Sequence, residues 1–169
     1  LFYFFPSKNN IQEYTVSGLT MGKIPYAVKY VFTKNVLRKN EIDSILINFN
    51  NIFSTYIPNS EISKINRSKG KIDISKEFFF LLNESKKIYK LTNGYFDPTV
   101  GPLVNIWGFG PQKFIQSPSI SEINNIKKSV GFDKLDFGEY YILKKTENTY
   151  LDFSSIAKGY AVDFLSEYL

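Results

Sequence analysis

The run from 92 to 110, TNGYFDPTVGPLVNIWGFG, constrains this chain most, because so many Gly, Pro, Asp and aromatic residues are untypical of regular core structure. Asn93-Gly94 tolerates the positive φ of a turn, and Asp97-Pro98 and Gly101-Pro102 stiffen the backbone. Four rings offer flat apolar faces: Tyr95, Phe96, Trp107 and Phe109. The run predicts a cradle for a planar ligand, and the alternative is an aromatic-rich structural loop with buried rings.

The 169 residues, 43% of them hydrophobic, are enough for one domain with a real core. The chain starts without Met and stops inside an apparent helix at Leu169, so we expect a piece of a longer protein. We interpret residues 1–12 as a remnant of a signal peptide or membrane anchor and residues 13–169 as the domain. The apolar Leu1–Phe5 is too short to span a bilayer, and a hydrophobic edge strand is the alternative for it.

The sequence contains no Cys and no His. It therefore excludes a zinc site of the usual kind, a Cys nucleophile and an imidazole base within these residues. Carboxylates, hydroxyls, Lys, backbone amides and an oxygen-bound ion such as Mg²⁺ remain for any chemistry. The formal charge of +5 comes from scattered lysines, which indicates a solvated basic surface rather than a nucleic-acid site.

Periodicity predicts an α+β fold rather than a regular alternation of strands and helices. Strands are expected at residues 25–33, 134–137, 140–144 and 149–153. One helix is expected to bury Ile42, Ile45, Leu46, Phe49, Ile52 and Phe53. A second starts after Ser75 as N-cap, buries Phe78, Leu81, Leu82, Ile88 and Tyr89, and ends at Asn93-Gly94. A third opens with a capping box from Ser119 to Glu122 and closes at Gly131, and a last one carries Ile156, Tyr160, Phe164 and Leu165.

A second candidate site is the junction LDFSSIAKG, residues 151–159. Its residue types are typical of a helix start that binds an anion. Asp152 lies at the end of the expected strand. We expect Ser154 and Ser155 to cap the following helix, and Lys158 to lie in the first turn of that helix. A phosphate suits such a helix start. Helix capping without a ligand is the alternative, and neither a P-loop nor a GxGxxG motif is present.

Four segments together resemble the FAD:protein FMN transferase family, also called the ApbE family. They fall in the family's order across nearly the whole chain: residues 17–22 (SGLTMG), 54–62 (STYIPNSEI) leading to Asn66, 92–110, and 151–160 with Asp152 and the run Ile156 to Tyr160. The third segment is long and specific.

The resemblance implies transfer of the FMN moiety of FAD to a Thr or Ser hydroxyl of an acceptor protein, with Mg²⁺ and with release of AMP. Residues 13–169 would then be the N-terminal part of a flavin transferase domain. By position, the residues implied to bind FAD are Met21, Tyr56, Tyr95, Phe96, Asp97, Asp152 and Lys158. Ser155 stands where the family offers a main-chain carbonyl to the metal.

The chain departs from the family's pattern at two places. Lys23, Ile24 and Pro25 precede Tyr26 where a small hydroxyl residue and an earlier Tyr are usual, and Ser154-Ser155 replaces a Gly or Ala pair. The family's later region, which supplies further metal ligands and a His base, is not among these residues. We therefore expect the catalytic groups beyond Leu169.

The resemblance also implies partners and a location. The acceptor would be a flavoprotein such as a subunit of a membrane redox complex, and the protein would lie on the periplasmic side of the cell envelope, as a lipoprotein or otherwise membrane-anchored. Two other functions stay open: hydrolysis of FAD to FMN and AMP, and flavin binding without catalysis.

Overall fold

The computed structural model describes residues 11–34, 36–111 and 117–168. The chain divides into two compact units, residues 1–48 and 49–169, and each is described by itself. The predicted remnant at 1–12, with its apolar Leu1–Phe5, lies outside the described residues except for Ile11 and Gln12. Within the described ranges, no helix combines the length and apolar character that crossing a bilayer requires.

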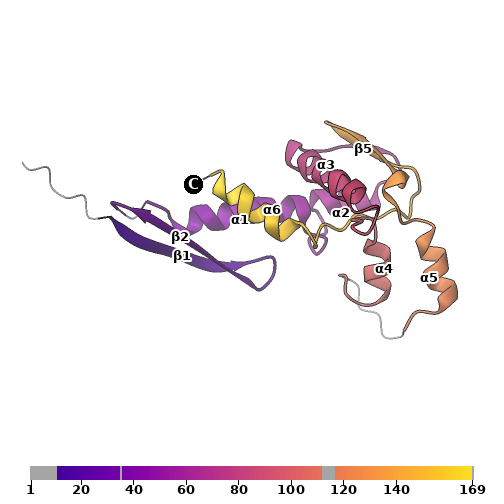
Figure 1. Ribbon diagram of the computed structural model, residues 1–169, viewed down its shortest axis with the longest axis horizontal. Coiled ribbons are helices and arrows are strands. Elements are labelled where there is room, and N and C mark those ends of the chain that lie inside the picture. The colour runs from indigo at the N-terminus through magenta and orange to yellow at the C-terminus, as the bar shows by residue number, and fades with distance from the viewer. Residues whose placement is uncertain (1–10, 35, 112–116, 169) are drawn as a thin grey trace, which may run out of the picture. The chain divides into compact units, whose positions relative to one another are not determined.

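The first unit contains an antiparallel hairpin of β1 (Gln12–Thr20) and β2 (Ile24–Phe32) (Figure 1). The strand predicted at 25–33 is confirmed as β2, whereas its partner β1 was not predicted. Met21 and Gly22 have φ values of 47° and 87° in the turn, so the backbone there adopts the left-handed conformation that hairpin turns need. Pro25 is accommodated as the partner of Leu19 in the ladder.

Tyr26 ties the hairpin to the start of α1 (Lys39–Phe53), within the same unit. Gly18 faces Tyr26 across the ladder, and a Cβ on Gly18 would lie 2.7 Å from the phenol ring. The phenol donates to the Asp43 carboxylate at 2.5 Å, and Lys39 hydrogen-bonds the same carboxylate. Burial and the Asp43 carboxylate raise the pKa of Tyr26 to about 12.

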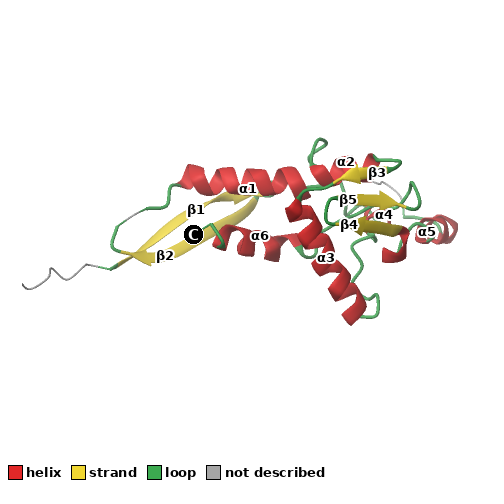
Figure 2. Cartoon of the chain, turned by 90° about the horizontal axis from the view of Figure 1, so that it is seen from above, coloured by secondary structure: helices red, strands yellow, loops and turns green. Residues whose placement is uncertain are grey.

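The second unit combines helices with a small antiparallel sheet of order β3-β5-β4, which confirms the α+β class (Figure 2). Its strands are β3 (Lys71–Asp73), β4 (Leu135–Gly138) and β5 (Tyr141–Lys144). Its helices are α2 (Glu61–Arg67), α3 (Lys76–Leu91), α4 (Gly101–Ile106), α5 (Ile120–Lys127) and α6 (Ala157–Ser166), with a short 3₁₀ turn at Phe132–Lys134. The elements α2, β3 and α4 were not predicted.

Aromatic side chains make up much of the core of this unit. Phe53 of α1 stacks on Phe78 of α3 with ring centroids 5.9 Å apart, and both rings meet Phe153 edge-on. Tyr160 of α6 packs against Phe53 at 5.7 Å. On the predicted apolar faces, Phe53, Phe78, Leu81, Leu82 and Leu165 are buried, as their spacing indicated, whereas Ile88 and Tyr89 are only half-buried.

The predicted starts of α3 and α5 are confirmed. Ser75 accepts a hydrogen bond from the Phe78 amide at 3.1 Å, and Ser119 and Glu122 form the complete capping box. The predicted end of α5 at Gly131 is wrong, because the helix ends at Lys127. Gly131 has φ 134° and instead begins the 3₁₀ turn.

The strand predicted at 149–153 is also wrong. This segment joins no strand ladder of the described residues and makes a single parallel bridge, between Tyr150 and Val100. Side chains and a neighbouring loop supply its other hydrogen bonds, which a pattern of alternating residues cannot reveal. These hydrogen bonds fix the segment that carries Asp152, a residue of the candidate site.

Candidate functional site

Two predicted site residues, Asp97 and Asp152, lie on neighbouring segments of the second unit. The amide of Asp152 donates to the carbonyl of Pro98 at 2.8 Å, next to the Val100–Tyr150 bridge. A Cβ on Gly101 would lie 2.4 Å from the Tyr150 ring and 3.3 Å from Cβ of Asp152. Close approach of the third and fourth motifs thus depends on a residue without a side chain.

Asp97 forms a tight turn that is anchored in the core. Its Oδ1 accepts from the amide of Thr99 at 2.8 Å and from the Thr99 hydroxyl at 2.7 Å. Thr99 is fully buried, and its hydroxyl also accepts from the Gly131 amide at 2.7 Å. The Asp97 carboxylate is therefore held by one oxygen, in an orientation set by a buried threonine.

Asp152 makes a similar turn before α6. Its Oδ1 accepts from the amide of Ser154 at 2.8 Å and from the Ser154 hydroxyl. The prediction that Ser154 and Ser155 cap the helix is wrong: Ile156 is the N-cap residue and no side chain caps it. The Ser154 hydroxyl donates to Asp152 and therefore does not cap α6.

Lys158 lies in the first turn of α6, as predicted, and its ammonium donates to the Ser154 carbonyl at 3.3 Å. Ser155 and Lys158 are both exposed. This placement leaves a cation within reach of any anion at the start of the helix. A Cβ on Gly159 would meet nothing within 4 Å.

Three of the four rings of the third motif face solvent rather than the core. Tyr95 is 97% exposed and Phe109 79%, and Trp107 is also exposed, while Phe96 is half-buried with its amide held by the Thr92 hydroxyl. The alternative of a loop with buried rings therefore does not describe Tyr95, Trp107 or Phe109. Residues 101–106 form helix α4, so the motif is turn, helix and turn rather than one irregular loop.

Tyr56 meets the end of the same motif. Its hydroxyl makes a long hydrogen bond, 3.4 Å, to the carbonyl of Phe109, and its ring is 65% exposed. Ser60 fixes the loop that carries Tyr56 by donating to the Ser54 carbonyl at 2.7 Å. The second, third and fourth motifs are thus joined within one unit, whereas Met21 lies in the hairpin turn of the first unit.

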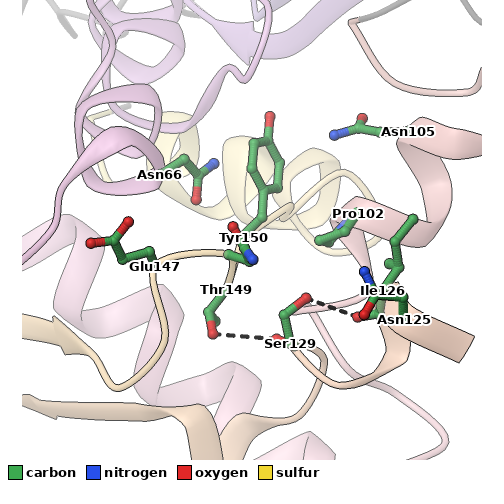
Figure 3. Close-up of a pocket in the computed structure, with 10 residues that line it drawn as sticks. Asn66, Pro102, Asn105, Asn125, Ile126, Ser129, Glu147, Thr149 and Tyr150 are labelled. Atoms are coloured by element: carbon green, nitrogen blue, oxygen red, sulfur yellow. Dashed lines mark hydrogen bonds between the residues drawn. The ribbon is translucent and has the colours of Figure 1, made fainter. Parts of the chain in front are cut away.

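A cavity of about 370 Å³ lies beside the Asp152 segment, between α4 and α5 (Figure 3). It is lined by Asn66, Pro102, Asn105, Asn125, Ile126, Ser129, Glu147, Asn148, Thr149 and Tyr150, and it contains no predicted site residue. Burial raises the pKa of Tyr150, although hydrogen bonds with the side chains of Asn105, Asn66 and Thr55 oppose this. The phenol of Tyr150 therefore keeps its proton at neutral pH.

The described residues contain no group of three or more His, Cys, Asp or Glu side chains suited to a metal ion. Asp97, Asp152 and the carbonyl of Ser155 are oxygen ligands of the chemistry that Mg²⁺ prefers, and they would hold it together with water and phosphate oxygens.

Sequence reasoning missed Thr99, Tyr150 and Lys144 and gave Asn66 no role. All four make polar contacts in or beside the site, and Thr99 and Lys144 are buried. A lone Thr or Lys inside a strand-like or turn-like stretch gives no signal of its partners. Asn66 stands out in the sequence only as the end of a motif.

Solved structures share this fold. The chain superimposes on the flavin transferase ApbE from Vibrio cholerae with a TM-score of 0.88 and 34% identity, covering 94% of this chain and 53% of that one. An apo flavinyl transferase from Pseudomonas stutzeri gives 0.85 and 30%, covering 94% and 53%. The chain thus has the fold of about half of a flavin transferase.

The chain belongs to the ApbE family, whose model matches residues 21–169. It is 36% identical over 168 residues to the FAD:protein FMN transferase of Haemophilus influenzae, covering 92% of this chain and 48% of that protein. The corresponding protein of Vibrio cholerae is 34% identical, with 94% and 49% covered. The chain thus spans about half the length of the curated relatives it matches.

Proposed function

We propose that the whole protein containing this chain transfers FMN from FAD to a Thr or Ser hydroxyl of an acceptor protein. The hydroxyl oxygen forms a bond to the phosphorus of the FMN moiety, the bond from that phosphorus to the AMP oxygen breaks, and AMP leaves. The hydroxyl proton passes to a base that we expect outside these residues, since the chain contains no His. The relatives' names, FAD:protein FMN transferase, motivate the reaction.

The hydrogen bond between Asp152 and Pro98 is the observation that carries this proposal. It joins two motifs, each with a carboxylate turn, and brings the start of α6 beside them. We infer that the FAD pyrophosphate lies near this helix start and Lys158, and that the exposed rings receive the flavin or adenine. Mg²⁺, when bound, would neutralise charge on the pyrophosphate.

The decisive test is incubation of the whole protein with FAD, Mg²⁺ and an acceptor protein, followed by in-gel flavin fluorescence. The control is an acceptor whose target Thr is replaced by Ala. Covalent flavin on the unmodified acceptor alone is the expected result. Release of AMP without flavin on the acceptor would favour FAD hydrolysis, and flavin binding without AMP release would favour a binding module.

We further propose that the protein works on the periplasmic side of the cell envelope, anchored to the membrane, on a flavoprotein subunit of a membrane redox complex. The apolar run Leu1–Phe5 motivates the anchor. Fractionation of cells that express the whole protein tests it. Recovery in the soluble cytoplasmic fraction would contradict both the location and this acceptor.

A further inference from the structure

Lys144 is a buried charge that the proposed reaction does not use directly. It lies on β5 with 7% of its surface exposed, and its ammonium donates to the carbonyls of Asn66 at 2.6 Å and Glu147 at 2.9 Å. Burial lowers the pKa of Lys144, with the Glu147 charge opposing. An ammonium is costly to remove from water, so these two contacts are needed to keep it there.

Asn66 is the next member of the same network. Its side-chain amide donates to the carbonyl of Leu151 at 2.9 Å, and its side-chain oxygen accepts from the amide of Leu151 at 2.8 Å. One side chain therefore makes both backbone hydrogen bonds that a neighbouring strand would make. The ammonium of Lys144 in turn donates to the main-chain carbonyl of Asn66.

Leu151 is followed by Asp152, whose amide is bonded to Pro98. The segment is thus fixed at consecutive residues, by Asn66 on Leu151 and by Pro98 on Asp152. A displacement of Asn66 would move Leu151 and, with it, the start of the turn that orients the Asp152 carboxylate.

We propose that Lys144 and Asn66 are positioning residues that set the Asp152 carboxylate for FAD, an inference that rests on the proposed function. Replacing the Lys144 ammonium by an apolar side chain of similar length would leave the carbonyls of Asn66 and Glu147 without this donor. The backbone of Asn66 would lose that restraint, and its side chain would shift with it.

The test is a double-mutant cycle in the whole protein with Lys144→Met, Asp152→Asn and both together. Lys144→Met is expected to lower kcat at saturating FAD about tenfold or more, because small misplacements of reacting groups are costly. In the Asp152→Asn background the same change should lower kcat less than about twofold, since coupled residues are not additive. The matched control is Lys145→Met, which removes the same charge from an exposed neighbour.

A second measurement is independent of activity. Amide hydrogen exchange at Leu151 and Asp152 should be at least about tenfold faster in Lys144→Met than in Lys145→Met, because local opening exposes those hydrogen bonds. Equal, additive losses of kcat in both backgrounds, or unchanged exchange, would overturn the inference. A wild-type protein that transfers no FMN while exchange still responds would refute the proposed function and leave the positioning intact. If Lys144→Met does not fold, Lys144→Gln takes its place.

Discussion

Gly101 and Tyr150 are packed so closely that a single methyl group does not fit between them. A Cβ on Gly101 would lie 2.4 Å from Cδ1 of the Tyr150 ring, beside the hydrogen bond from Asp152 to Pro98. Residues far apart in the sequence thus meet at one point. The two motifs that we assign to FAD are aligned there.

Gly101→Ala is therefore expected to lower the free energy of unfolding by about 1–3 kcal/mol through overpacking. It should also weaken FAD binding, because the Asp97 and Asp152 turns would be forced apart. Chemical denaturation and FAD titration measure the two effects. Gly70→Ala, where a Cβ meets nothing within 4 Å, is the control and should change stability by less than about 0.5 kcal/mol. Equal effects at both glycines would contradict this account.

Loss of a ring at Tyr56 or Phe96 should weaken FAD binding by the whole protein. A stacked aromatic ring contributes about 1 kcal/mol beyond its buried area, which corresponds to roughly fivefold in Kd. The measurement is an FAD titration of Tyr56→Ala and Phe96→Ala. Tyr140→Ala, which removes an exposed ring from the turn before β5, should bind FAD like the wild type. Unchanged affinity in both site variants would remove the aromatic motif from the FAD site.

Asp152→Asn and Lys158→Ala should separate charge from local geometry. Asn keeps an oxygen that can accept from Ser154, so the turn survives while the carboxylate charge is lost. We expect Asp152→Asn to slow Mg²⁺-dependent turnover by about 100-fold.

Lys158→Ala should mainly raise the KM for FAD, because a cation near the pyrophosphate is lost. Asp136→Asn and Lys127→Ala make the same charge changes at exposed positions and serve as controls. Wild-type kinetics in both site variants would leave the start of α6 without a role in catalysis.

Residues 1–169 alone should not transfer FMN, even where they fold and bind flavin. The sequence has no His to accept the acceptor's proton near neutral pH, and we expect this base and further metal ligands outside these residues. The fragment and the whole protein are incubated in parallel with FAD, Mg²⁺ and acceptor. Fluorescent acceptor from the fragment would show that the essential base and ligands lie within these residues.

Alkaline pH should destabilise the fold partly through Tyr26. Its folded pKa of about 12 lies above the ordinary 10.0, so the folded state holds its proton longer than the unfolded state. This stabilisation is fully present below pH 10 and is lost as the pH rises through about 12. Tyr26→Phe should flatten the fall in stability over that window, as measured by denaturation at several pH values. A fall as steep as in the wild type would exclude Tyr26 as a contributor.

Local features of this protein can be predicted from neighbouring residues alone. Helices α1 and α3 follow from apolar spacing and from Ser75, and α5 begins at a capping box that Ser119 and Glu122 specify. The α+β class follows from the predicted helices and strands and their order, and the four motifs, 92–110 among them, resemble the family whose model matches residues 21–169. These signals are local, so neighbouring residues are sufficient to carry them.

Tertiary structure alone decided how the site is assembled. Asn66, Lys144 and Thr99 bind groups between 32 and 85 residues away, and no local pattern names such partners. Residues 149–153 alternate like a strand, yet a side chain and a loop take the place of a strand partner. In both cases several partners could satisfy the same polar groups, and only the packing of distant segments selects one.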